Sequence, residues 1–198
     1  MHQNLKDINQ NFMFLGDLVE HSPIVQINTG IKNINLYVKF EFLNLTGSIK
    51  DKVAKYILDS AKNQGLLRNN QLVVEASSGN MGAALSACGL IYNYPVHITV
   101  PEKTGLIKRK IIQSYGAELT VCPNTNSPSD PDFYVKRAQK IANDRNGYFV
   151  NQYDNILNTE CHYQTTGQEI VEFFEYIQQP LDYFITAGGS GGTVTGCA

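Results

Sequence analysis

Strand-like and helix-like patterns alternate along most of this chain, and that alternation restricts the fold more than any other feature. Short apolar runs of strand length are followed by stretches whose apolar residues recur at three- and four-residue steps. Such a series predicts parallel strands joined by helices, hence an α/β fold. The expected strands are Asn35–Phe42, Gln71–Ala76, Val96–Val100, Glu118–Cys122, Tyr148–Gln152 and Tyr183–Ala187. The expected helices are one between Ser48 and Gly65, then Gly82–Tyr92, Leu106–Tyr115, Phe133–Asn146 and His162–Ile177.

The composition is that of an ordinary globular protein and excludes several function classes. The 198 residues are 42% hydrophobic and 17% charged, which is enough to bury a core, and the formal net charge is -2. Because there is no basic stripe, we expect neither nucleic acid nor an anionic membrane as a partner. No apolar run is long enough to span a membrane, and Met1–Glu20 is too polar for a secretory signal. We therefore expect a cytoplasmic location.

The cysteines and histidines give no sign of a metal site. Cys88, Cys122, Cys161 and Cys197 lie far apart, and the four histidines show no ligand-like spacing to them. The pattern therefore indicates neither zinc nor a disulfide framework, and we expect each cysteine to be a small buried apolar residue.

Lys50 stands at the start of the expected helix that follows a polar loop. Ser48 is the expected N-cap, and Gly65 occupies the position of a C-terminal cap. The helix turns Lys50 partly toward its apolar face, where an ammonium group must lose its charge or find a partner. Such an amine is suited to forming a Schiff base. The alternative is a partly exposed lysine whose ammonium group reaches water.

The loop Ser77–Gly82 follows a strand that is expected to be buried, and it opens an alanine-rich helix. Its backbone N–H groups therefore face outward with the positive end of the helix dipole behind them, which suits a carboxylate. Ser77 and Ser78 add hydroxyl donors, and Asn80 can offer its side-chain amide to a ring oxygen. The alternative is a serine loop that only caps the helix.

A second loop, Gly188–Thr193, also lies between an expected strand and a helix start. Its four glycines allow a close approach of the backbone to an anion, and Ser190 and Thr193 supply hydroxyl groups, so the loop suits a phosphate. It carries neither a P-loop lysine nor dinucleotide spacing. A simple tight turn is the alternative reading.

Gln152 lies at the carboxyl end of an expected strand, at the edge of the sheet where open α/β folds bind ligands. We consider it a candidate substrate ligand, and a surface glutamine is the alternative.

Together these motifs resemble those of the cysteine synthase and cystathionine β-synthase family, from about Ser22 to Ala198. They are Gly47-Ser48-Ile49-Lys50-Asp51, Ser77-Ser78-Gly79-Asn80-Met81-Gly82, Asn151-Gln152-Tyr153, His162-Tyr163-Gln164-Thr165-Thr166-Gly167 and Gly189-Ser190-Gly191-Gly192-Thr193. The resemblance implies pyridoxal 5'-phosphate as the cofactor and a two-domain fold of type II with three-layer αβα architecture. Residues 36–152 would form the smaller, inserted domain. Residues 1–35 and 153–198 would form an incomplete part of the larger one.

The resemblance also implies a role for each candidate site residue. Lys50 would hold the cofactor aldehyde as a Schiff base and act as the catalytic base. Asn80 would hydrogen-bond the ring hydroxyl group. The phosphate would lie on Gly189, Ser190, Gly191, Gly192 and Thr193. The carboxylate of the amino-acid substrate would lie on Ser77, Ser78, Gly79, the backbone of Met81 and Gln152.

The implied reaction is replacement of the β-substituent of a serine-type amino acid by a thiol or sulfide. The loop Pro123–Asp132 resembles that of cystathionine synthases, so we expect serine and homocysteine as the substrates of the full-length enzyme. Alternatives are a cysteine synthase acting on O-acetylserine and sulfide, a dehydratase or threonine synthase, and a truncated non-catalytic protein. Because Ala198 falls about one turn into an expected helix, we expect a fragment of an enzyme that is a homodimer at full length.

Overall fold

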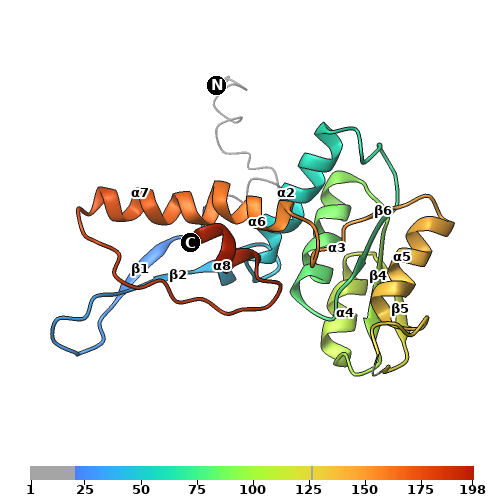
Figure 1. Ribbon diagram of the computed structural model, residues 1–198, viewed down its shortest axis with the longest axis horizontal. Helices are drawn as coiled ribbons and strands as arrows, with labels where there is room; N and C mark the ends of the chain where they lie inside the picture. Colours follow the sequence, from blue (N-terminus) through green and yellow to red (C-terminus); the bar gives the residue numbers. More distant parts are fainter. Residues whose placement is uncertain (1–20, 126) are drawn as a thin grey trace, which may run out of the picture.

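The computed structural model describes residues 21–125 and 127–198. Two parts lie side by side in this region (Figure 1). One is a four-stranded sheet between helices, and the other is a two-stranded hairpin beside a long helix. Residues 1–20 of the expected larger domain lie outside the described part of the chain.

The four-stranded sheet is built from the alternating segments of the middle of the chain. Its strands are β3 (Val73–Ala76), β4 (Val96–Pro101), β5 (Glu118–Cys122) and β6 (Tyr148–Phe149). Their order is β5-β4-β3-β6, and every pair is parallel. All residues of β3 and β4 are buried, which is the pattern of central strands with both faces covered.

Helices cover both faces of this sheet, with one apolar core on each side. The helices α2 (Lys50–Asn63), α3 (Asn80–Tyr92) and α4 (Leu106–Ser114) share the larger core with the strands, and α5 (Tyr134–Asp144) covers the opposite face (Figure 1). On the α5 side, Ala138 and Ala142 pack against Val74 and Ala76. The expected three-layer αβα arrangement is therefore present.

The second part combines segments from both ends of the described chain. The strands β1 (Ile24–Ile27) and β2 (Leu36–Lys39) form an antiparallel hairpin. The helix α7 (Gln168–Tyr176) lies along it (Figure 1), and the ring of Tyr37 contacts those of Phe173 and Phe174 edge to face, each at 5.3 Å. The pairing of β1 with β2 crosses the expected domain boundary at residue 35, and the division into domains stays a prediction.

The expected helix over His162–Ile177 is in fact a longer and interrupted one. It begins as α6 (Leu157–His162), widens into a π-helical turn at Tyr163–Gly167, and continues as α7. A last short helix, α8 (Gly192–Cys197), packs on α6. A 3-10 turn, Glu41–Leu43, ends the segment that was expected to remain extended to Phe42.

The predicted strand Tyr183–Ala187 is wrong. This segment pairs with no strand in the described part of the chain, and Tyr183 and Ile185 are 84% and 87% exposed. A strand exists only where a neighbour accepts and donates its backbone hydrogen bonds, so the apolar pattern alone does not produce one.

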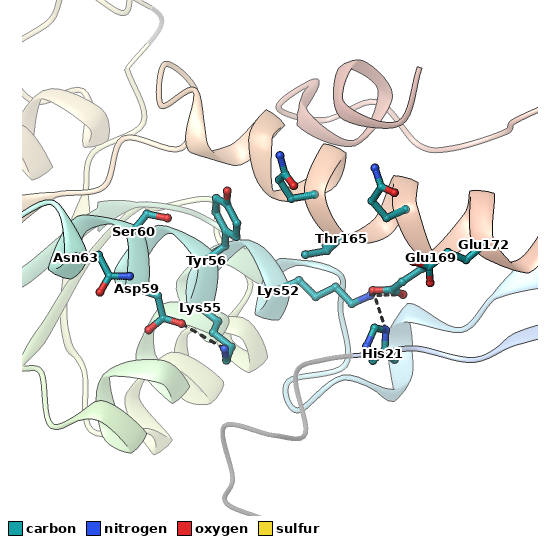
Figure 2. Close-up of a pocket in the computed structure, with 12 residues that line it drawn as sticks. His21, Lys52, Lys55, Tyr56, Asp59, Ser60, Asn63, Thr165, Glu169 and Glu172 are labelled. Atoms are coloured by element: carbon teal, nitrogen blue, oxygen red, sulfur yellow. Dashed lines mark hydrogen bonds and ion pairs between the residues drawn. The ribbon is translucent and has the colours of Figure 1, made fainter.

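The buried charges lie where the two parts meet. Lys52, on α2, donates to Glu169 Oε1 and Oε2 on α7 at 2.7 and 2.8 Å, as Figure 2 shows. Lys39 pairs with the same carboxylate, and Glu41 lies 3.4 Å from Lys52 Nζ. These side chains are almost entirely shielded from solvent. The charge network therefore fixes α7 and the hairpin against the start of α2.

Cys88, Cys122 and Cys161 are buried as expected, and Cys197 is half-buried. Within residues 21–125 and 127–198 no disulfide and no cluster of three metal-binding side chains occurs. None of the helices described there is long and apolar enough to span a membrane.

Candidate active site

Lys50 is the first residue of α2, and it lies half-buried beside α6. The N-cap is Ile49, one residue later than the expected Ser48. Ser48 Oγ accepts a hydrogen bond from Lys50 N at 3.2 Å. Gly65 has a φ of +72° and ends the helix as expected. Burial lowers the pKa of Lys50, and the neighbouring Cys161 opposes this shift. The amine is therefore easier to deprotonate than that of a surface lysine.

The serine loop Ser77–Gly82 is held by hydrogen bonds to its own Ser77 side chain, and three of its backbone N–H groups remain free in the described part of the chain. Ser77 is buried, and its Oγ accepts from the N–H groups of Gly79 and Gly82 at 3.3 and 3.0 Å. The N–H groups of Ser78, Asn80 and Met81 have no hydrogen-bond partner among the described residues. These three N–H groups lie at the start of α3 and are the donors that the predicted carboxylate site requires; the site itself stays a prediction.

Gln152 lies at the same edge of the sheet, after β6, and is buried. Its Nε2 donates to Glu75 Oε1 at 3.2 Å, and its N–H lies 3.4 Å from Glu75 Oε2. Burial raises the pKa of Glu75 to about 8, although the hydrogen bonds from Gln152 oppose the shift. One hydrogen of the Gln152 amide group is thus engaged, and the other remains available for a ligand.

The glycine loop is held in place by two side chains of α6. Asn158 Nδ2 donates to Ser190 Oγ at 2.8 Å, and His162 Nε2 lies 3.2 Å from Thr193 Oγ1. Gly191 has a φ of +86°, a conformation that favours glycine. A Cβ on Gly192 would lie 2.5 Å from Asn158 Oδ1, so only glycine allows this close approach.

The same loop is open where an anion would lie. No atom stands within 4 Å of a Cβ placed on Gly188 or Gly189. The buried Asn158 Oδ1 has no hydrogen-bond partner among the described residues. The loop has the room, the hydroxyl groups and the helix start that a phosphate group needs, so these residues fit pyridoxal phosphate.

Helix α6 connects the lysine with the glycine loop. It packs on α2 and on α8, and Lys50 contributes, after burial, to the low pKa of His162, which is about 4. The carboxyl ends of β3 and β6 place the serine loop and Gln152 at one edge of the sheet. The fold therefore groups the predicted residues into two neighbourhoods. One contains Lys50 and the glycine loop, and the other contains the serine loop and Gln152. Among the described residues, no hydrogen bond links Lys50 Nζ itself to either loop.

Three supporting residues were not assigned a site role from the sequence. Glu75 accepts a hydrogen bond from Gln152, and Asn158 and His162 contact the hydroxyl groups of the glycine loop. Glu75 could have been noticed as the one charged residue in the apolar run Leu72–Ala76. Asn158 gives no signal of its own, and His162 was only part of a motif.

A hollow of about 520 Å³ lies between α2 and the α6–α7 segment (Figure 2). Lys52, Lys55, Asp59 and Glu169 line it, so its charges are mixed. None of the predicted site residues contributes to it.

Residues 16–198 match the family model described as pyridoxal-phosphate dependent enzyme, and the chain belongs to this family. The expected cofactor, pyridoxal phosphate, is the cofactor of this family, so that prediction is confirmed. Among curated proteins, the chain is similar to a cysteine synthase of a Flavobacterium species (strain K3-15), with 32% identity over 92% of this chain. A probable cysteine synthase of Bacillus subtilis (strain 168) is 31% identical over 91% of this chain.

Among solved structures, an O-ureido-L-serine synthase is similar, with a TM-score of 0.86, 30% identity, and coverage of 94% of this chain and 58% of that one. The expected assignment to fold type II is confirmed by this likeness and by the parallel sheet. The chain spans about 58% of the length of the curated relatives as well.

Proposed function

We propose that the full-length protein is a pyridoxal phosphate-dependent enzyme that replaces the β-substituent of a serine-type amino acid with a sulfur nucleophile. The observation that carries this proposal is the half-buried Lys50 at the start of α2, with a pKa lowered by burial. The names of the relatives, cysteine synthase and O-ureido-L-serine synthase, support the same reaction class.

Lys50 is proposed as the residue that binds the cofactor and accepts the proton from the substrate Cα. In its neutral form Nζ is a nucleophile toward an aldehyde, and once released it can accept a proton from the substrate Cα. The lowered pKa makes the neutral form more accessible. When bound, pyridoxal phosphate supplies the electron sink for bond cleavage at Cα.

The two loops would hold the negative charges. Gly189–Thr193 would bind the phosphate, with Asn158 and His162 holding the hydroxyl groups of Ser190 and Thr193 in position. The substrate carboxylate would lie on Gln152 and on the free amides of Ser78, Asn80 and Met81. The side chain of Asn80 would hydrogen-bond the ring hydroxyl group of the cofactor. Fixed donors of this kind orient the reactants without reorganisation.

Two sulfur acceptors are compatible with this reaction class. Sulfide is the acceptor implied by the name cysteine synthase. A larger acceptor, such as homocysteine, is suggested by the resemblance of the loop Pro123–Asp132 to that of cystathionine synthases. The start of this loop lies near the serine loop: Asn124 Oδ1 accepts a hydrogen bond from Lys103 N at 3.0 Å, and Lys103 and Ser78 line the same hollow. Competition between sulfide and homocysteine, read as cysteine against cystathionine, separates the two.

The assignment of Lys50 is tested by reductive trapping. The protein is mixed with pyridoxal phosphate and borohydride, and the covalently bound cofactor is measured by mass spectrometry. We expect the label on Lys50 in the parent protein, its loss in Lys50→Ala, and its retention in Lys55→Ala, a matched change further along α2. Equal labelling of the parent and Lys50→Ala would refute the assignment.

A further inference from the structure

A second hollow lies next to the serine loop, at the start of α4. Its volume is about 840 Å³, and its lining residues are Ser78 and the segment Lys103–Lys108. Ser78 belongs to the proposed carboxylate loop as well. Lys108 Nζ lies 3.9 Å from the position of a Cβ on Gly79, so this side chain reaches across to the serine loop.

The hollow presents positive charge that no acidic side chain neutralises within residues 21–125 and 127–198. In the described part of the chain, neither Lys103 nor Lys108 makes an ion pair. Helix α4 starts after Gly105 without a side-chain cap, and its first internal hydrogen bond is that of Arg109 N to Gly105 O. The N–H groups of Leu106, Ile107 and Lys108 are therefore free to bind an anion.

A buried hydroxyl group gives an independent indication of a ligand. Thr104 is 6% exposed and lines the hollow, and its Oγ1 has no hydrogen-bond partner among the described residues. A buried polar group without a partner is costly, and native proteins rarely keep one unless something else supplies the bond.

The remaining lining is apolar. Leu106 and Ile107 are 71% and 75% exposed and lie beside the free amides. A ligand that satisfies the whole hollow therefore has a carboxylate at one end and a short aliphatic chain. This carboxylate is distinct from that of the first substrate, because α3 and α4 each provide their own helix start.

We propose that this hollow binds the sulfur acceptor, and that the acceptor is an aliphatic thiol with a carboxylate group. The carboxylate lies on Lys108 and the amides of residues 106–108, with Thr104 Oγ1 as a further donor. The methylene groups lie on Leu106 and Ile107. The thiol group and the role as acceptor site rest on the proposed function, whereas the binding of a carboxylate with a short aliphatic chain does not.

The test is a titration of the 198-residue protein, without pyridoxal phosphate, with 3-mercaptopropionate. Amide chemical shifts in ¹H–¹⁵N spectra give the Kd. We expect saturable shifts at Gly105–Lys108 and weaker binding, by about tenfold, in Lys108→Gln, the size expected for a lost charge-assisted hydrogen bond. Thr104→Val should weaken binding less, and Lys110→Gln, a change on the same helix outside the hollow, should leave the Kd unchanged.

Two further ligands define the chemistry. Propionate should bind at the same amides, and 1-propanethiol, which lacks the carboxylate, should bind at least about tenfold more weakly. Absence of saturable shifts at residues 105–108, or an unchanged Kd in Lys108→Gln, would overturn the proposal. Because no cofactor is present, this result is separate from the borohydride test of Lys50.

Discussion

Glu75 Oε1 accepts a hydrogen bond from Gln152 Nε2 at 3.2 Å, and both side chains are buried at the edge of the parallel sheet. No cation pairs with this carboxyl group in the described part of the chain. Burial raises the pKa of Glu75 to about 8, compared with 4.5 for an ordinary glutamate. Glu75 therefore holds a candidate substrate ligand while remaining largely protonated at neutral pH.

We predict that this group makes the protein less stable as the pH rises. Between pH 4.5 and 8 the folded state keeps a proton on Glu75 that the unfolded chain has lost. The free energy of unfolding should fall over this window by up to about 5 kcal/mol and then level off. Urea denaturation of the parent and of Glu75→Gln at pH 5 and pH 8 measures this difference.

In Glu75→Gln the pH dependence over that window should largely disappear, because glutamine cannot ionise but can still accept from Gln152. Glu102→Gln, a change at an exposed position, serves as the control and should behave like the parent. The same slope in the parent and in Glu75→Gln would contradict the prediction.

Removal of the buried carboxylate of Glu169 should be strongly destabilising. Glu169→Gln leaves the ammonium groups of Lys39 and Lys52 without their closest counter-charge in a shielded site. We expect a loss of about 3 to 5 kcal/mol in the free energy of unfolding. Lys140→Met, which breaks the exposed pair with Asp144, should cost under about 1 kcal/mol. Similar losses in the two variants would show that the Glu169 network contributes no more than a surface pair.

The phosphate role of the glycine loop is best tested at Gly189. An aspartate at Gly191 would be strained by the φ of +86°, whereas a Cβ on Gly189 meets no atom within 4 Å. Gly189→Asp places a carboxylate against the proposed phosphate, and we expect a loss of about 2 to 4 kcal/mol in pyridoxal phosphate binding. Gly189→Ala should bind nearly normally. Fluorescence titration gives both affinities, and equal affinities would exclude this loop as the phosphate site.

The apolar strip formed by Leu181, Tyr183, Phe184 and Ile185 should promote self-association of the 198-residue chain. These side chains are exposed, two of them by more than 80%. We expect Tyr183→Lys combined with Ile185→Lys to reduce association in sedimentation experiments. The melting temperature should change little, because exposed side chains contribute little packing energy. An unchanged association state would show that the strip is not the surface involved.

The sequence by itself determined the parallel sheet, its covering helices and the two loops, Ser77–Gly82 and Gly188–Thr193, that precede a helix. These features depend on local patterns: apolar periodicity defines β3, β4 and α2, and a serine or glycine loop directly before a helix leaves backbone amides without a partner in that helix. Most helix ends shifted by only a residue or two, as the cap at Ile49 in place of Ser48 illustrates, whereas the helix expected from His162 begins at Leu157.

Only the tertiary structure decided the features that depend on a neighbour distant in sequence. Tyr183–Ala187 has the composition of a strand, yet it forms none because no described strand lies beside it. The partners of Gln152, Ser190 and Thr193 could not be predicted either, since Glu75, Asn158 and His162 reach them through the packing of β3 and α6. The unpartnered hydroxyl group of Thr104 is visible only once its surroundings are known, because hydrogen-bond satisfaction is a property of the folded neighbourhood.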